Sequence, residues 1–224
     1  MRKIKLIQIL TFSVLVVIIF ALSIGTINLF FGRLNLGDYR GVVLVSATLI
    51  ILFFYALIIY RIFIFFFPVS EGEIIKDSKE EFAFHIYILF FLTFFYPLMR
   101  SGFIPMPLLR LIYIGLGTHL GKNTYCAGIM LDPPFIETGA NSAIGQYALL
   151  IPHIMEGNRL AHYRIKIGNN VTIGAHAVVM AGVTIEDNAI VGVGAVVPKG
   201  THIAAGEVWG GIPAKKIKDI EPNQ

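Results

Sequence analysis

Two long apolar runs occupy the first third of the chain. From Ile4 to Phe31 and from Gly41 to Phe67 most side chains are apolar, and the only charged residues are Lys5 in the first run and Arg61 in the second. Each run exceeds the ~20 residues that a membrane-spanning helix needs. The stretch between them, residues 32–40, is short and polar. This pattern predicts a transmembrane helical hairpin over residues 1–67.

A secretory signal is the alternative interpretation of the first run, because RKIK resembles a basic leader and ALS resembles a cleavage site. The run is long for such a signal, and a second apolar run follows closely, so we favour the hairpin. Arg2, Lys3 and Lys5 favour a cytoplasmic N-terminus by the positive-inside bias. We therefore expect a multi-pass protein of the cell inner (cytoplasmic) membrane, with its C-terminal part facing the cytoplasm.

The next segment, residues 68–110, is predicted to be an interfacial helical linker. The run from Phe82 to Leu98 is short for a membrane span and carries His85, and we expect Pro97 and the prolines beyond it to end the helix. Such a helix is typical of the membrane interface. A third crossing is the alternative, but it would place the rest of the chain on the other side of the membrane.

A different period begins in the second half of the chain. In the stretch that starts at Ile165, inward-type residues recur at every sixth position: Ile167, Ile173, Val179, Ile185, Val191, Val197, Ile203 and Trp209. Six matches neither the helix period of ~3.6 nor the strand period of two. A six-residue repeat is typical of a parallel β-helix, in which three short strands close one coil. We expect these residues to point into the coil and small residues to occupy its turns.

The same period returns upstream in a shifted phase, at Ile114, Leu120, Cys126, Asp132, Thr138, Ile144 and Leu150. Seventeen residues instead of six separate Leu150 from Ile167, which predicts that eleven residues near positions 156–166 leave the coil as a functional loop. Asp132 and Thr138 are polar at positions expected to be apolar. Either Pro133 and the next proline distort that coil, or Asp132 faces a functional cleft.

Composition and charge narrow the choice of function. Hydrophobic residues make up 56% of the 224 residues, more than a soluble domain needs, and the formal net charge of +4 fits attraction to anionic lipids. No Lys/Arg stripe with interleaved aromatic residues is present, which disfavours nucleic acid as a partner. Cys126 is the only cysteine, so an internal disulfide is excluded, and we interpret it as a small packing residue.

Three segments, LGKNTY, IGNNVTIGAHAVVMAGVTIEDNAIVGVGAVVPKG and GGIPAKKIK, resemble the hexapeptide-repeat acyltransferases of the galactoside and xenobiotic O-acetyltransferase type. EGE at residues 71–73, FAFHIYILFFLTFFYPL and IPMPLLRL resemble the membrane-associated branch of that family more loosely. The resemblance implies a left-handed parallel β-helix over residues 111–224, a homotrimer, acetyl-CoA as co-substrate and no metal. The handedness comes from the resemblance alone, because parallel crossovers are in general right-handed.

Transfer of an acyl group to a hydroxyl requires a base and hydrogen-bond donors for the oxyanion. His153 directly precedes the predicted loop, where the resemblance places the family's catalytic histidine, so we predict that His153 is the general base. His162 is the second candidate. Glu156 and Asp132 are the carboxylates that we expect near the imidazole, Asp132 because it matches the family's acidic acceptor-site residue. An ordinary solvated carboxylate is the alternative for each. The remaining histidines are expected to be surface or anchoring residues: His85, His119, His176 and His202.

The resemblance also implies a groove for coenzyme A between adjacent β-helices of the trimer. The residues expected along pantetheine and pyrophosphate are Ala175, Val193, Gly194, Pro198 and Lys199. Those expected at the adenine and its 3′-phosphate are Gly211, Pro213, Lys215 and Lys218. Pro198 stands where the family often has Thr, which removes a hydroxyl and an amide. The small residues alone do not discriminate, because a tight corner of a β-helix favours Gly and Ala in any case.

The predicted function is that of a membrane-anchored O-acetyltransferase acting on a lipid-linked or membrane-proximal acceptor such as a glycan. Transfer to an amine, or of a longer acyl chain, is compatible with the same residues. A zinc carbonic anhydrase is a different class on this fold and needs three converging histidines. A noncatalytic trimeric scaffold that clusters membrane partners is the third alternative.

Overall fold

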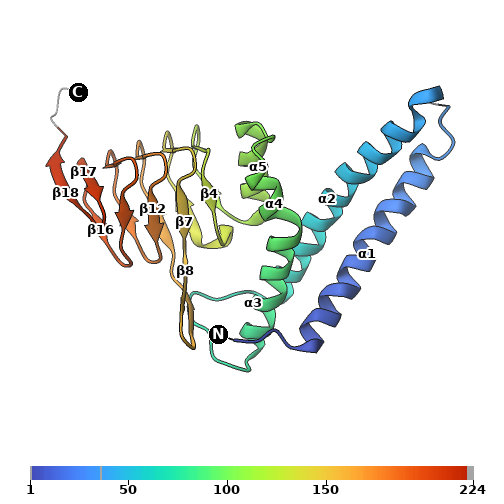
Figure 1. Cartoon of the computed structure of the whole chain (residues 1–224), viewed down its shortest axis with the longest axis horizontal. Helices are drawn as coiled ribbons and strands as arrows, with labels where there is room; N and C mark the ends of the chain where they lie inside the picture. The colour runs from blue at the N-terminus through green and yellow to red at the C-terminus, as the bar shows by residue number, and fades with distance from the viewer. Residues whose placement is uncertain (1, 36, 221–224) are drawn as a thin grey trace. The chain divides into compact units, whose positions relative to one another are not determined.

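The chain forms two compact units. The computed structural model describes residues 2–35 and 37–220. One unit is helical and consists of Arg2–Val69 and Lys76–Leu98; the other consists of Ser70–Ile75 and residues from 99 onward and contains the β-structure. Figure 1 shows the helices in blue to green and the strands of the β-helix in yellow-green to red.

The helical unit is built on two long helices, α1 (Leu6–Phe31) and α2 (Arg40–Phe66), which follow each other after a short turn (Figure 1). Both are long and apolar enough to cross a membrane by length and composition, and so is the helical stretch Lys79–Arg100. A hydrogen bond of 2.8 Å between the hydroxyls of Thr26 and Tyr55 joins α1 to α2. The two predicted helices are therefore present, and their crossing of a membrane stays a prediction.

The third apolar stretch comprises α3 (Lys79–Phe90), a π-helical segment η2 (Phe91–Phe95) and α4 (Tyr96–Arg100). Ser78 caps α3, since its hydroxyl accepts a hydrogen bond of 3.1 Å from the backbone of Glu81. The expectation that Pro97 ends this helix is wrong. Pro97 lies in the first turn of α4, directly after the π-helical segment, where a missing backbone N–H is tolerated.

The second unit contains a helix, α5 (Met106–Leu116), followed by a parallel β-helix with three sheets. The first sheet consists of β2 (His119–Leu120), β5 (Ile136–Thr138), β10 (Ile165–Ile167), β13 (Thr184–Ile185) and β16 (His202–Ile203). The second consists of β3 (Tyr125–Cys126), β6 (Ala143–Ile144), β11 (Thr172–Ile173), β14 (Ile190–Val191), β17 (Glu207–Gly211) and the antiparallel β18 (Ala214–Asp219). The third sheet consists of β4 (Ile129–Met130), β7 (Leu149–Ile151), β12 (Val178–Met180) and β15 (Val196–Val197).

The strand register confirms the six-residue repeat. Residues eighteen apart are paired in the downstream coils, for example Ile167 with Ile185 and Val179 with Val197. The inward residues of these coils are buried almost completely, including Ile173 and Val191. Thr138 also points inward, and its hydroxyl donates a hydrogen bond of 3.4 Å to the His119 carbonyl, so this polar side chain is satisfied inside the coil.

Two expectations for the first coil are wrong. Ile114 lies in α5, so the expected domain boundary at residue 111 falls inside a helix and the first strand begins at His119. Met130, not Asp132, occupies the inward position opposite Leu150. The hydroxyl of Tyr113 in α5 donates to the Gly128 carbonyl and accepts from the Met130 amide, both at 3.1 Å. These bonds hold β4 so that its inward residue comes two positions earlier than the six-residue repeat predicts. Asp132 therefore lies outside the interior of the coil.

The extra residues form an ordered β-hairpin of β8 (His153–Glu156) and β9 (Arg159–His162), not an irregular loop. The expected position near residues 156–166 is too late by about three residues, because Ile165–Ile167 is already strand β10 of the coil. The hairpin projects from the third sheet after β7 (Figure 1). Its turn contains Gly157 at a positive φ of 58°. A short strand from the linker between α2 and α3, β1 (Gly72–Glu73), pairs antiparallel with β9 and completes a three-stranded sheet.

Candidate active site

His153 and Asp132 meet where the hairpin leaves the β-helix. Nδ1 of His153 lies 2.5 Å from Oδ2 of Asp132. The Asp132 side chain is 1% exposed and the His153 side chain is 21% exposed, so the carboxylate is covered and the imidazole reaches the surface. A carboxylate on Nδ1 fixes the ring and its tautomer, which leaves Nε2 to accept a proton. The pair therefore has the arrangement of a general base with an orienting acid.

Asp132 reaches this position through a local break in the first coil. Its φ is 46°, in the left-handed region that few residues other than glycine adopt. A short 3₁₀ segment, η3 (Pro133–Phe135), follows, and the Phe135 amide donates to the Asp132 carbonyl at 3.0 Å. Both alternatives of the sequence analysis thus apply: the prolines distort the coil, and Asp132 faces the candidate site.

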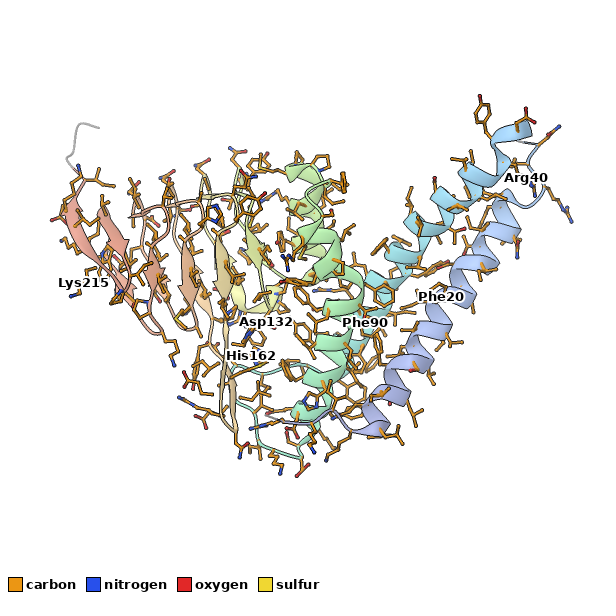
Figure 2. The ribbon with its side chains drawn as sticks, viewed as in Figure 1. Phe20, Arg40, Phe90, Asp132, His162 and Lys215 are labelled. Atoms are coloured by element: carbon orange, nitrogen blue, oxygen red, sulfur yellow. The ribbon has the colours of Figure 1, made fainter. Side chains whose placement is uncertain are left out.

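His162 stands on the other side of Asp132. It ends β9 directly opposite His153 in the hairpin register, and its Nε2 lies 3.8 Å from Oδ1 of Asp132. Figure 2 shows Asp132 and His162 close together near the base of the hairpin. The His162 ring is 0% exposed and stacks on Phe135 with ring centroids 4.6 Å apart. A ring buried in this way cannot meet a substrate hydroxyl directly, so His153 is the better candidate for the base.

The two partners shift each other's pKa in opposite directions. Burial alone raises the pKa of the Asp132 carboxyl, but the hydrogen bond from His153 and the adjacent His162 ring more than offset this and hold it below its usual value. Burial lowers the pKa of the His153 imidazole, and the hydrogen bond and negative charge of Asp132 outweigh that effect and raise it. Asp132 is therefore ionised at neutral pH, and His153 is a stronger base than a free imidazole.

Glu156 does not join this pair. It lies at the exposed end of β8 and forms an ion pair with Lys199, whose hydrogen bond lowers the pKa of the Glu156 carboxyl. This contact ties the end of the hairpin to the turn after β15. The orienting position at His153 is thus filled by Asp132, from the preceding coil, and not by the carboxylate nearest in sequence.

Arg164 connects the site to the linker that contains β1. Its backbone amide and Nε donate to the Glu71 carboxylate at 2.9 and 3.1 Å, and a terminal nitrogen donates to Glu137 at 2.8 Å. The guanidinium lies 5.9 Å from the centroid of Phe135, the ring on which His162 stacks. The sequence analysis missed these supporting residues. The EGE motif was visible, but no periodicity relates residue 71 to residue 164.

Three of the residues predicted for coenzyme A, Ala175, Val193 and Gly194, lie at the turns between the second and third sheets. Gly174 is required there, because a Cβ on it would lie 2.5 Å from the Val193 amide nitrogen. The Gly194 amide donates to the Ala175 carbonyl at 2.9 Å. Within residues 2–35 and 37–220, the amides of Ala175 and Val193 have no protein acceptor. Two donors one coil apart thus remain for a ligand.

The other predicted residues for coenzyme A lie at two places on the last coils. Pro198 and Lys199 follow β15 at the opposite edge of the third sheet, and Lys199 pairs with Glu156. Lys215 and Lys218 lie on β18 and are exposed, with Gly211 and Pro213 in the adjacent turn. Figure 2 shows Lys215 at the end of the β-helix away from Asp132. Gly211 lies one coil beyond Val193, since Val191 pairs with Trp209, so within one chain only Pro198 and Lys199 stand apart from the other predicted residues.

Comparisons with known proteins find family and sequence matches that include the β-helical part of the chain. The family "Bacterial transferase hexapeptide (six repeats)" matches residues 164–199. Galactoside O-acetyltransferase of Escherichia coli is 32% identical over 120 residues, covering 49% of this chain and 58% of the relative. Gamma carbonic anhydrase 1 of Arabidopsis thaliana is 30% identical over 129 residues, covering 49% of this chain and 44% of the relative. The chain thus spans about half the length of the curated relatives it matches.

Two solved structures show a partial likeness. A galactoside acetyltransferase in complex with coenzyme A has a TM-score of 0.38 and 32% identity, covering 41% of this chain and 48% of its own. A maltose O-acetyltransferase from Clostridium difficile has a TM-score of 0.45 and 22% identity, covering 76% of this chain and 89% of its own. The repeat, its strand register and the matched residues agree with one another. The β-helical half of this chain is therefore similar to the hexapeptide-repeat transferases.

Proposed function

We propose that the protein is a membrane-anchored O-acetyltransferase that transfers an acetyl group from acetyl-CoA to a hydroxyl of a lipid-linked or membrane-proximal acceptor such as a glycan. The observation that carries this proposal is the 2.5 Å contact between buried Asp132 and partly exposed His153 at the base of the hairpin. It places a raised-pKa imidazole on a hexapeptide-repeat β-helix. The function is that of the galactoside O-acetyltransferase relative, extended to a membrane setting.

In the proposed reaction, Nε2 of His153 removes the proton of the acceptor hydroxyl as its oxygen attacks the thioester carbonyl. The ionised Asp132 stabilises the imidazolium that forms. The carbon–sulfur bond then breaks, and the departing CoA thiolate takes the proton from His153. The new ester and free CoA are the products, so atoms and charges balance in a direct transfer. A positioned base of this kind contributes about 100- to 10,000-fold to the rate.

The groups assigned to acetyl-CoA are the amides and lysines along the last coils. The unpaired amides of Ala175 and Val193 fit the carbonyl groups of pantetheine or the developing oxyanion. Lys199, Lys215 and Lys218 would bind the phosphates as point charges. To bind a phosphate, Lys199 would have to give up its ion pair with Glu156. Lys199 lies at the opposite edge of the third sheet from the other groups within one chain, which supports a groove that two subunits share.

We propose that the protein forms a homotrimer and that the outer surface of the third sheet is the contact between its subunits. The outward side chains there are all apolar and partly exposed: Ile129, Leu149, Ile151, Val178, Met180 and Val196. The outward side of the first sheet is polar by contrast, with Glu137 and Lys166 in register. A flat apolar surface of this kind usually marks a contact between proteins. A closed trimer would cover it without leaving an open edge.

Membrane anchoring is proposed for the α1–α2 hairpin, with the stretch Lys79–Arg100 at the interface and not crossing. Residues 70–75 and residues from 99 onward belong to the same compact unit, so the chain enters and leaves this stretch from one folded body. A crossing helix releases its ends on opposite sides of the bilayer. The stretch is also more buried, at 56% of its most apolar window against 17% for each hairpin helix. Tethering would concentrate the enzyme at a lipid-anchored acceptor.

The test is CoA release from acetyl-CoA by the full chain in the presence of candidate membrane acceptors. His153→Ala should lower turnover about 100- to 10,000-fold, while the exposed His176→Ala in a turn of the β-helix should not. Equal turnover of wild type and His153→Ala would remove the mechanism. Weak CoA binding by both would favour the noncatalytic scaffold instead.

A zinc carbonic anhydrase is the second candidate because two mitochondrial gamma carbonic anhydrases are among the relatives. Within residues 2–35 and 37–220 of one chain, no group of three or more His, Cys, Asp or Glu side chains is placed to hold a metal. Metal analysis of the purified protein decides between the two classes. Stoichiometric zinc, together with CO₂ hydration, would replace the acyltransferase proposal.

A further inference from the structure

Helix α5 covers the first coil of the β-helix with one of its faces. Leu109, Tyr113 and Leu116 on this face are buried. The guanidinium of Arg110 donates to the carbonyls of Thr124 at 2.7 Å and Leu120 at 3.3 Å. The edge strands of the β-helix are thereby shielded. These bonds and the packing make α5 a fixed part of the β-helical unit.

The opposite face of α5 is apolar and open. We define the apolar face as Met106, Leu108, Leu111 and Ile114 of α5 together with Phe103 just before the helix, all of which are exposed. Phe103 is 89% exposed and Leu111 is 63% exposed. Arg110 is the only charged residue of α5, and its guanidinium is turned to the carbonyls of the first coil. A contiguous apolar surface without charges is unfavourable in water and usually has a partner.

The position of the apolar face in the chain indicates its partner. Only residues 101–105 separate α5 from Arg100, the end of a 22-residue helical stretch that is apolar enough for a membrane. Phe103 lies in this connection, and aromatic side chains concentrate at the membrane interface. A helix with one apolar face next to an apolar helix is typical of segments that lie in the interface plane.

We propose that the apolar face of α5 docks on the lipid surface of the membrane and holds the first coil of the β-helix there. The proposal rests on the proposed membrane anchoring and adds a second contact to it. Helix α5 packs against η3, the segment that directly follows Asp132. Docking would therefore present the His153–Asp132 pair close to the bilayer, where the acetyl acceptor is lipid-linked or membrane-proximal.

Site-directed spin labelling of the full chain tests the proposal. The protein carrying Leu111→Cys is labelled with a nitroxide and reconstituted in vesicles of phosphatidylethanolamine and phosphatidylglycerol. Accessibility to oxygen, which partitions into lipid, is compared with accessibility to a water-soluble nickel chelate. Cys126 is buried, and burial raises the pKa of its thiol to about 12, so unmodified protein should label weakly. Phe103→Cys is the second site in case Leu111→Cys fails to fold.

Two controls separate the possible outcomes. Val17→Cys on the exposed side of α1 reports a lipid position, and Lys166→Cys on the first sheet reports a water position. The expected result is an oxygen-favoured pattern at Leu111 and Phe103 that matches Val17 and differs from Lys166. A chelate-accessible Leu111 overturns the proposal, as does a label shielded from both reagents, which would indicate a second copy or the helical unit as the cover. If Val17 itself is not in lipid, the membrane anchoring fails.

Discussion

At the scale of residues, the candidate chemistry depends on a contact between positions that lie in different coils. Asp132 leaves the interior because Met130 takes the inward position, and it then meets His153 across the base of the hairpin. His162 closes the other side of the carboxylate, and Phe135 supports His162 by stacking. The carboxylate therefore has little freedom to rotate. The fixed geometry explains how a short side chain can orient an imidazole twenty-one residues away in sequence.

Replacing Asp132 with Asn tests this role. The amide keeps the shape and removes the charge that raises the His153 pKa, so turnover should fall about 100- to 10,000-fold. The base works only when deprotonated. Because Asp132 raises the pKa of His153, the acidic limb of the kcat/KM profile should move to lower pH in the variant. Asp219→Asn, at an exposed carboxylate, is the control and should leave the profile unchanged. If the acidic limb of the Asp132→Asn profile also stays in place, Asp132 does not act through His153.

At the scale of elements, the hairpin is held from two sides. Strand β1 pairs with β9 along one edge, and Lys199 binds Glu156 at the end of β8. Ile154 and Ala161 of the hairpin pack on Ala181 of the β-helix. An inserted segment of eleven residues would otherwise be mobile. The linker between α2 and α3 thus contributes directly to the order of the element that carries both histidines.

Glu71→Gln should loosen the hairpin. Glu71 accepts two hydrogen bonds from Arg164, and losing its charge should raise amide exchange over residues 153–162 by roughly fivefold, since exposed ion pairs contribute up to ~1 kcal/mol. Hydrogen-exchange mass spectrometry measures this effect. Glu73→Gln, which removes a single exposed contact to Arg159, is the matched control and should have a smaller effect. Equal exchange in both variants and wild type would argue against an anchoring role of Glu71.

At the scale of the whole molecule, the three sheets of the β-helix differ in what they present outward. The third sheet is apolar on its outer side, and the first sheet carries charged and polar residues. The hairpin with His153 projects beside the apolar sheet, directly after β7. A site shared between neighbouring copies would explain why Lys199 is separated within one chain from the other groups expected to bind coenzyme A.

A lysine on the third sheet should break the proposed trimer. Met180→Lys would place a charge within the apolar surface, where burial of an unpaired ammonium costs several kcal/mol. We expect monomers in detergent by light scattering, together with loss of CoA binding. Thr184→Lys on the first sheet is the control and should stay trimeric. A trimeric Met180→Lys protein, or a monomeric wild type, would refute this interface.

Much of the architecture follows from local patterns. The helices α1 and α2 coincide with the two apolar runs, and the inward residues from Ile167 to Ile203 coincide with the six-residue repeat. The extra residues before Ile165 were visible as a break in the period, although their hairpin structure was not. The first coil escaped prediction because the bonds between Tyr113 and β4 shift its register, and a helix contact of this kind leaves no periodic trace.

The sequence by itself determined the apolar helices, the repeat and the position of His153 at the interruption, because each depends on spacing between neighbours along the chain. Only the tertiary structure decided that Asp132 and not Glu156 meets His153, that His162 is buried behind them, and that Glu71 reaches Arg164. These contacts join residues from separate coils and from the linker. Their geometry arises from how the coils stack and how α5 and β1 pack on them, and no local period encodes it.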